Sequence, residues 1–437
     1  MNASETAAPV GAKPRYQRAQ RRQMEMRTLS LDQMLPDDHR VRLVWTYVES
    51  LDLSPLYEQI RAVEGHVGRS PIDPRILFAL WLYATLDGVG KARHLDRLCR
   101  EQITYQWLCG GVTVNYHTLS DFRTQHAALL DSLLTQSVSV LLHQGLVSLE
   151  RVAQDGMRVR ASAGASSFRR QPTLEECLAE AEAQIEALKR EAENEDGGAE
   201  NRRQQAARER AARERAERIQ QALDELPEIQ RKLEQRKQGD GKKGRASTTD
   251  PEARRMKMAD GGFRPAYNVQ FATAAGSQVI VGVDVTNTGG DGGLMGAMVD
   301  QIEERYQQRP GEYLADGGFS TYDDIAALES SGTTVFTPVR EAEKKLAKGE
   351  DPFAPRKSDS PGLAAWRQRM GTEAAKEIYK QRAGTAEFPN AGCRNRGLTQ
   401  FLVRGLRKTK AVALWQALAH NFHRMLALRA AAGLVAN

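Results

Sequence analysis

Two stretches of this chain, each with an apolar run closed by an aspartate, predict its fold: Val152-Ala-Gln-Asp155-Gly156 and Tyr313-Leu-Ala-Asp316-Gly-Gly-Phe319. Each is a short apolar run that stops at an Asp-Gly pair, the pattern of a buried strand that leads into a turn. Open sheets with flanking helices place their active sites at such strand ends. Asp155 and Asp316 are therefore the first candidates for functional carboxylates.

A third acid, Glu387, lies in a helix-compatible stretch that begins at Tyr379. Carboxylate oxygens are hard ligands that suit Mg²⁺, and a pair of such ions can activate a nucleophile and stabilise a leaving oxygen in phosphodiester chemistry. An Asp before a Gly is, taken alone, more often a turn former than a ligand. The positions of all three acids nevertheless predict one metal site. Nearby cations that could bind phosphates are Arg382, Arg394 and Arg396.

Composition narrows the possible classes of protein. A length of 437 residues predicts two or three domains, and 41% hydrophobic with 27% charged residues is typical of a soluble globular protein. No apolar run is long enough for a bilayer span, and no signal peptide is expected. Four scattered cysteines without a CxxC pair favour a reducing cytosol over a zinc site or disulfides. The net charge of +6 is compatible with nucleic acid but weak by itself.

The first third of the chain reads as helical. Pro74 starts an apolar run that ends at Gly88, and residues 92–123 read as a helix, a glycine turn and a second helix. Helix-turn-helix shapes of this kind often contact DNA, and Arg123 is a candidate for that contact. A plain helical bundle is the competing interpretation, because such shapes are common in all-helical domains.

Strand signals start at residue 151, and they are interrupted by a polar segment, 173–237, with two heptad-like seams that predict an antiparallel helical hairpin. A β-hairpin, a helix, the strand that ends at Asp316, another helix and a short strand follow. The order predicts an α/β fold: a mixed sheet with flanking helices, preceded by an all-α domain and interrupted by the hairpin insertion. The expected units are a disordered basic arm (1–27) and a helical DNA-binding domain (28–150). A catalytic domain follows in two parts (151–172 and 247–437), and the hairpin with its linker (173–246) lies between them.

Three other polar residues are also candidates for a functional role. Asp291, in a glycine-rich stretch, is interpreted as a loop or helix-start residue, with a minor chance of supporting the site. His420 and His423 have a spacing that some metal ligands share, but no third nitrogen or sulfur partner is evident. A core or interface role is therefore favoured for both histidines.

Several segments together resemble a DDE transposase of a bacterial insertion sequence. They start with a His-x-Thr-Leu-x-x-Phe-Arg segment that ends at Arg123, and an Asp-Gly-x-x-Val-x-Ala segment that starts at Asp155. A Gly-Gly-Phe-Arg-Pro-x-Tyr-Asn-Val-Gln segment (261–270) and the Asp-Gly-Gly-Phe segment at Asp316 follow. Last comes Thr-Ala-Glu with a later Arg-Asn-Arg-Gly-Leu, within residues 385–398. The resemblance covers about residues 28–430.

The resemblance implies an RNase H-like catalytic domain whose catalytic and metal-binding triad is Asp155, Asp316 and Glu387. The family's Tyr-Arg-Glu-Lys signature would fall on Tyr379, Arg382, Glu387 and Arg394. It departs from the family pattern by one extra residue before Glu387, by Arg394 in place of Lys, and by Met157 where Thr is common.

The family also implies two Mg²⁺ or Mn²⁺ ions, DNA partners, and a homodimer in the complex that joins two DNA ends. The DNA would be terminal inverted repeats and target DNA, and the location the bacterial cytoplasm, in association with the nucleoid. Two other functions stay open. One is a structure-specific nuclease of the same fold that performs no strand transfer, and the other is a DNA-binding protein whose nuclease-like domain is inactive.

Overall fold

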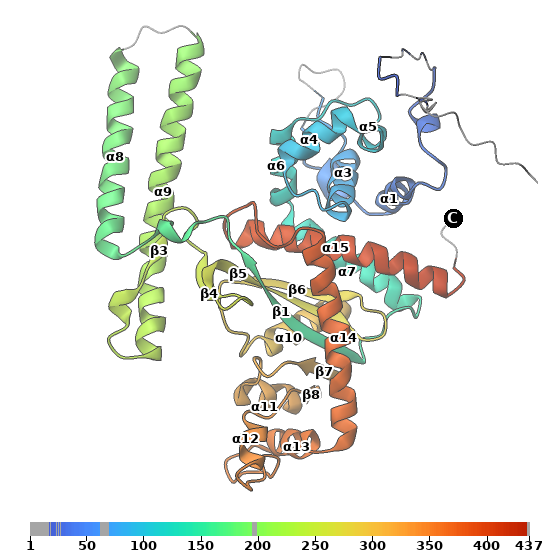
Figure 1. Cartoon of the computed structure of the whole chain (residues 1–437), viewed down its shortest axis with the longest axis vertical. Helices are drawn as coiled ribbons and strands as arrows, with labels where there is room; N and C mark the ends of the chain where they lie inside the picture. Colours follow the sequence, from blue (N-terminus) through green and yellow to red (C-terminus); the bar gives the residue numbers. More distant parts are fainter. Residues whose placement is uncertain are drawn as a thin grey trace, which may run out of the picture.

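A computed structural model describes residues 17–434 apart from 18, 23, 25, 27, 62–69 and 195–198. Most of the predicted basic arm therefore lies outside the described residues, and so does the Gly197-Gly198 break between the two insertion helices. Figure 1 shows three parts: a helical N-terminal region, a sheet flanked by helices, and a long helical hairpin that stands away from the sheet.

The central sheet is mixed. Its main strands are β1 (Arg151–Arg160), β5 (Phe263–Ala274), β6 (Ile280–Thr286), β7 (Glu312–Ala315) and β8 (Thr334–Phe336). β1 lies between β5, to which it is antiparallel, and β7, to which it is parallel, and β8 continues the sheet beside β7. The outer edge of β5 pairs first with β4 (Arg254–Lys257) and then with β6. This strand arrangement is RNase H-like, so the predicted fold class is confirmed.

Helices cover both faces of the sheet. α10 (Met295–Tyr306) and α11 (Tyr322–Ser330) connect β6 to β7 and β7 to β8, as the sequence predicts. α14 (Glu373–Asn395) crosses β1 and β5, and α15 (Leu406–Ala431) packs against β6. Two short helices, α12 (Ala342–Leu346) and α13 (Pro361–Met370), precede α14. Figure 1 shows α14 running along the sheet toward α15.

The N-terminal helices do not enclose a separate core. α3 (Pro74–Leu86), α6 (Tyr116–Gln125) and α7 (Ala127–His143) all pack on α15, and one continuous cluster of buried apolar side chains runs from Leu35 to Met425. α3 is buried around nearly its whole circumference because it is surrounded by other helices. The remaining helices here are α1 (Arg40–Glu49), α2 (Ser54–Tyr57), α4 (Ala92–Glu101) and α5 (Ile103–Cys109).

The predicted helical hairpin is present as α8 (Gln171–Asn194) and α9 (Ala199–Arg236). It has a small apolar core of its own, built on Leu174, Ile219 and Leu226. A two-stranded sheet closes its base, because β2 (Phe168–Arg169) pairs with β3 (Ala246–Ser247). The two ends of the insertion therefore lie side by side.

Two local predictions are wrong. Asp155 does not close a strand, because β1 continues through it to Arg160. The helix expected to run from residue 92 to 107 is divided into α4 and α5, because Gln102 adopts an extended conformation with ψ 128°. The second insertion helix continues through Pro227 to Arg236, which agrees with the helical segment expected over residues 173–237. A proline inside a helix removes one backbone hydrogen bond, and packing of the remaining helix can outweigh that loss.

Candidate active site

Asp155 and Asp316 are neighbours across two adjacent strands. β1 and β7 pair in parallel with Gln154 opposite Ala315, so the next residue of each strand is an aspartate at the same level. Paired strands lie roughly 5 Å apart, which places the two carboxylates within reach of a shared ligand. Burial, together with the charge of Asp316, raises the pKa of Asp155 to about 6. Two acids that are far apart in sequence are therefore brought together.

Asn390, which the sequence reasoning missed, completes the surroundings of Asp155. Its Nδ2 donates to Asp155 Oδ2 at 2.8 Å, while the backbone N–H of Gly156 donates to Oδ1 at 3.0 Å. The Asn390 side chain is 2% exposed, and its Oδ1 is buried without a hydrogen-bond partner. Its signal in the sequence is its position three residues after Glu387, on the same side of a helix.

Glu387 lies on α14, with its side chain turned toward a cation. Its Oε1 accepts a hydrogen bond from Arg382 at 3.1 Å, and 61% of its side chain is exposed. Arg382 is also the largest influence that lowers the pKa of Asp155. In this conformation Arg382 pairs with Glu387, and its predicted phosphate contact stays a prediction.

Tyr379 belongs to the same cluster. Burial raises its pKa, and its charge interactions involve Arg382, Asp316 and Asp155. Five of the residues singled out from the sequence therefore meet at one place between β1, β7 and α14: Asp155, Asp316, Tyr379, Arg382 and Glu387.

The donor set suits a divalent cation. Two adjacent carboxylates, one with a raised pKa, carry negative charge that a cation would stabilise, and the unpartnered carbonyl oxygen of Asn390 is a hard donor beside them. Within the described residues, no group of three or more His, Cys, Asp or Glu side chains is arranged to hold a metal ion. The two aspartates are in place, whereas Glu387 is paired with Arg382.

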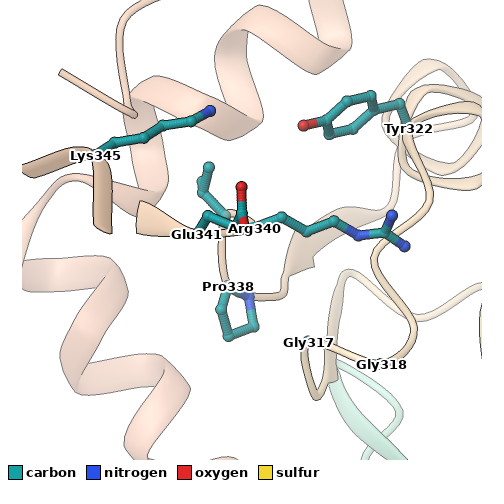
Figure 2. A pocket seen from close by; sticks show the side chains of 8 residues that line it. Gly317, Gly318, Tyr322, Pro338, Arg340, Glu341 and Lys345 are labelled. Atoms are coloured by element: carbon teal, nitrogen blue, oxygen red, sulfur yellow. The ribbon is translucent and has the colours of Figure 1, made fainter. Parts of the chain in front are cut away.

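A cavity of about 760 Å³ opens directly after Asp316. It is lined by Gly317 and Gly318 of the loop after β7 and by residues 338–341 beyond β8. Figure 2 shows the Arg340 side chain extending toward the side where Tyr322 and Gly318 lie, and the Lys345 amine facing the Tyr322 ring. Neither Arg340 nor Lys345 forms a salt bridge with another described residue. The cavity lining therefore carries two cations and one carboxylate, Glu341.

Asp291 supports the opposite face of β1. Its Oδ1 accepts hydrogen bonds from Asn268 at 2.6 Å and from Gln270 at 2.8 Å. A Cβ at position 156 would lie 2.4 Å from the same Oδ1, so only glycine fits there. The minor possibility that Asp291 supports the site is thus consistent with its contacts next to Asp155.

Arg123 and Arg396 lie together in a second cavity, of about 310 Å³, between the N-terminal helices and the end of α14. Arg123 donates to the Gly90 carbonyl and stacks on Trp81, with its guanidinium carbon 4.8 Å from the ring centre. Burial lowers the pKa of Arg123 to about 10. The lining also contains Lys91 but no acidic residue.

Arg394 and the two histidines lie apart from the aspartates. Arg394 is exposed in the last turn of α14. His420 is 3% exposed, and its Nε2 lies 2.8 Å from the carbonyl oxygen of Gln278. The favoured core role of His420 is confirmed.

Comparison with known families agrees with this geometry. A family model described as a transposase domain (DUF772) matches residues 29–125, and one described as a transposase DDE domain matches residues 231–422. Searches of curated proteins and of solved structures found no match. None of the helices in the described part of the chain combines the length and apolarity that crossing a bilayer requires.

The mixed sheet and the paired aspartates define an α/β protein of the RNase H-like class. The two matched segments, one in the helical N-terminal region and one across most of the sheet, identify the kind of protein within that class. The chain belongs to the DDE transposases of insertion sequences.

Proposed function

We propose that this transposase cleaves DNA at the ends of its insertion sequence and joins those ends to target DNA, with Asp155, Asp316 and Glu387 as its catalytic acids. The observation that carries the proposal is the adjacency of Asp155 and Asp316, with Asn390 of α14 bonded to Asp155. That contact brings the helix that carries Glu387 against the two aspartates. Asp155 within β1, Asp316 directly after β7 and the helix thus form one site.

Two Mg²⁺ or Mn²⁺ ions would be held by Asp155, Asp316 and Glu387, and when bound they would supply charge stabilisation for in-line phosphoryl transfer. For Glu387 to take part, its carboxylate must leave Arg382. Arg382 then becomes available to bind a phosphate, as the sequence predicts. The guanidinium balances the acidic cluster in the present conformation.

The overall reaction has two steps, and in each step one phosphorus–oxygen bond forms while another breaks. Water adds to the phosphorus at the element's end, the bond to the 3′ oxygen breaks, and that oxygen leaves as a hydroxyl. The 3′-hydroxyl then attacks a phosphorus of target DNA and displaces the target's 3′ oxygen. Arg340 and Lys345 are placed to bind the phosphates next to Asp316.

Recognition of the DNA ends is assigned to the N-terminal helices. Arg123 of α6 and Arg396 after α14 share one cavity without an acidic lining residue, so a single DNA phosphate could contact both regions of the chain. Arg394, exposed on α14, and Tyr379 would contribute flanking contacts. Joining two ends requires two active sites, so a homodimer is expected in the complex.

The test is cleavage of duplexes that carry the native element ends. Asp155→Asn, Asp316→Asn and Glu387→Gln should each lower Mg²⁺-dependent cutting by more than about 100-fold and keep DNA binding, because each removes one ligand. Asp323→Asn, on the exposed first turn of α11, is the matched control.

Each outcome has a definite meaning. Near-normal cutting by any of the three variants removes that residue from the site. Cutting without joining to target DNA supports a nuclease, and end binding without any cutting supports a DNA-binding protein with an inactive site.

A further inference from the structure

A basic groove lies where the helical hairpin meets the sheet. Its volume is about 570 Å³, and its walls come from the C-terminal part of α9, the 240–245 segment, β4, the start of β5 and residues 287–289. In Figure 1 the lower end of α9 lies beside β4 at the base of the hairpin. The groove is therefore formed by the insertion and the catalytic sheet together, and neither part makes it alone.

The charge of the groove is strongly one-sided. Its lining has seven basic side chains and one acid, Asp240. Three of the basic residues form salt bridges with acids: Lys232 with Glu228, Lys243 with Asp240, and Arg254 with Glu225. The other four form no salt bridge with a described residue: Arg170, Arg236, Arg245 and Arg255. Four uncompensated guanidinium groups in one hollow favour an anionic partner with repeated charges.

The groove also offers an apolar surface. Phe263, at the start of β5, is 58% exposed, which is unusual for a large aromatic side chain on a strand. Ile229 and Leu233 of α9 are half-buried in the same lining. Arginines interleaved with an exposed aromatic ring are typical of surfaces that bind nucleic acid, where the ring packs against sugar or base.

The position of the groove relative to Asp155 follows from the strand register. Asp155 lies opposite Phe271 of β5, and Phe263 is eight residues further along that strand, roughly 26 Å away. The nearer wall, residues 287–289, follows Thr286 directly. Thr286 pairs with Asn268 of β5, and Asn268 lies roughly 10 Å from Phe271 along the strand. Arg158 of β1 ties this wall to the catalytic strand, because it donates to the Gly289 carbonyl at 2.8 Å.

We propose that this groove binds the sugar-phosphate backbone of duplex DNA, and that the helical insertion exists to form one side of it. The inference rests on the proposed function only in taking DNA as the partner. DNA rises about 3.4 Å per base pair, so the bound phosphates lie about three to eight base pairs from the phosphodiester at Asp155. The insertion thereby holds DNA that flanks the cleavage site.

The first experiment measures affinity of the full chain for a duplex without divalent metal, so that no cleavage is needed. The double variant Arg245→Ala with Arg255→Ala should bind about tenfold more weakly at moderate salt. It should also reduce the slope of log affinity against log salt by about 2, because two phosphate contacts are lost. Phe263→Ala should weaken binding and leave the slope unchanged.

The matched control is Arg208→Ala with Arg210→Ala. Both residues are exposed on α9 and lie outside the groove, so the net charge changes equally. An equal loss of affinity in the control would mean that only the overall charge matters, and this would overturn the proposal. A change of oligomeric state in the groove variant with unchanged DNA affinity would instead assign the groove to contact between two copies of the chain.

A second experiment locates the contact. Single neutral methylphosphonates are placed along the end duplex, and the loss of affinity is compared for wild type and the groove variant. Wild type should be sensitive about three to eight base pairs from the cut, and the variant should lose that sensitivity alone. Sensitivity that is the same in both proteins refutes the groove. Absence of cleavage by any protein contradicts the catalytic assignment and leaves this result intact.

Discussion

Asn390 holds Asp155 through a single hydrogen bond, and its own carbonyl oxygen has no partner. A buried amide in this position orients the carboxylate that is assigned to the metal, and loss of such a supporting partner typically lowers metal affinity or activity by about 10–100-fold. We expect Asn390→Ala to slow cleavage by that factor with unchanged affinity for end DNA. Asn395→Ala, at the exposed end of the same helix, should be neutral. Equal cleavage rates for the two variants would exclude this role.

His420 makes folding stability depend on pH. Burial lowers its pKa to about 4, from 6.5 in the unfolded chain, and the groups around it are the Gln278 carbonyl, Arg396, Arg424 and His423. Between pH 6.5 and 4 the unfolded chain binds more protons than the folded one, so the contribution is complete above pH 6.5 and is lost as pH falls.

Protonation of His420 should therefore lower the free energy of unfolding by about 2–3 kcal/mol when the pH falls from 7 to 4. Urea unfolding of wild type and His420→Gln at both pH values measures the difference, and the variant should show the smaller drop. His117→Gln, on the exposed face of α6, is the control. Equal drops for wild type and His420→Gln would show that another group is responsible.

At the scale of elements, α14 has a proline inside the segment that carries the site. Pro389 lies between Glu387 and Asn390 and lacks the N–H that would bond to the Thr385 carbonyl. Pro389→Ala should raise the melting temperature by a few degrees, because the missing hydrogen bond is restored. It should also lower cleavage several-fold, because Glu387 and Asn390 shift relative to the strands.

Pro227 in α9 provides the comparison, since it too lies inside a helix. Pro227→Ala should gain stability without loss of cleavage, as it is not near the aspartates. Thermal unfolding and initial cleavage rates of the two variants decide the point. Full activity of Pro389→Ala would mean that Pro389 has no catalytic role.

At the scale of the whole molecule, the two large additions to the sheet differ in how they are attached. The N-terminal helices share one apolar core with α15, whereas α8 and α9 have a separate core and end at paired strands. Removing residues 28–148 should therefore expose α15 and yield an aggregating chain. Arg169 and Ala246 are cross-strand partners, so an Asn-Gly turn can replace residues 170–245.

The shortened chain should unfold cooperatively within about 5 °C of wild type, because its main core is intact. It should also bind DNA more weakly, since one wall of the basic groove is gone. Circular dichroism and calorimetry test the first expectation. A folded, soluble chain after removal of residues 28–148, or loss of folding after removal of the hairpin, would reverse the assignment of the two units.

The sequence by itself determined the elements whose signals are local. The apolar run that stops at Asp316 predicted the end of β7, whereas β1 continues past Asp155 to Arg160. α10, α11 and the α8–α9 hairpin follow from periodicity, capping and glycine turns, all of which act within a few residues. Motifs spread along the chain predicted the family, which the matched segments confirm.

Only the tertiary structure decided which side chains meet. Asn390 has no sequence signal beyond its spacing from Glu387, and its role appears only because α14 crosses β1. Arg123 and Arg396 share a cavity, and Glu387 pairs with Arg382, through contacts that depend on how helices pack. Periodicity reports which face of an element is buried but not what it is buried against, because packing partners are chosen by the whole chain.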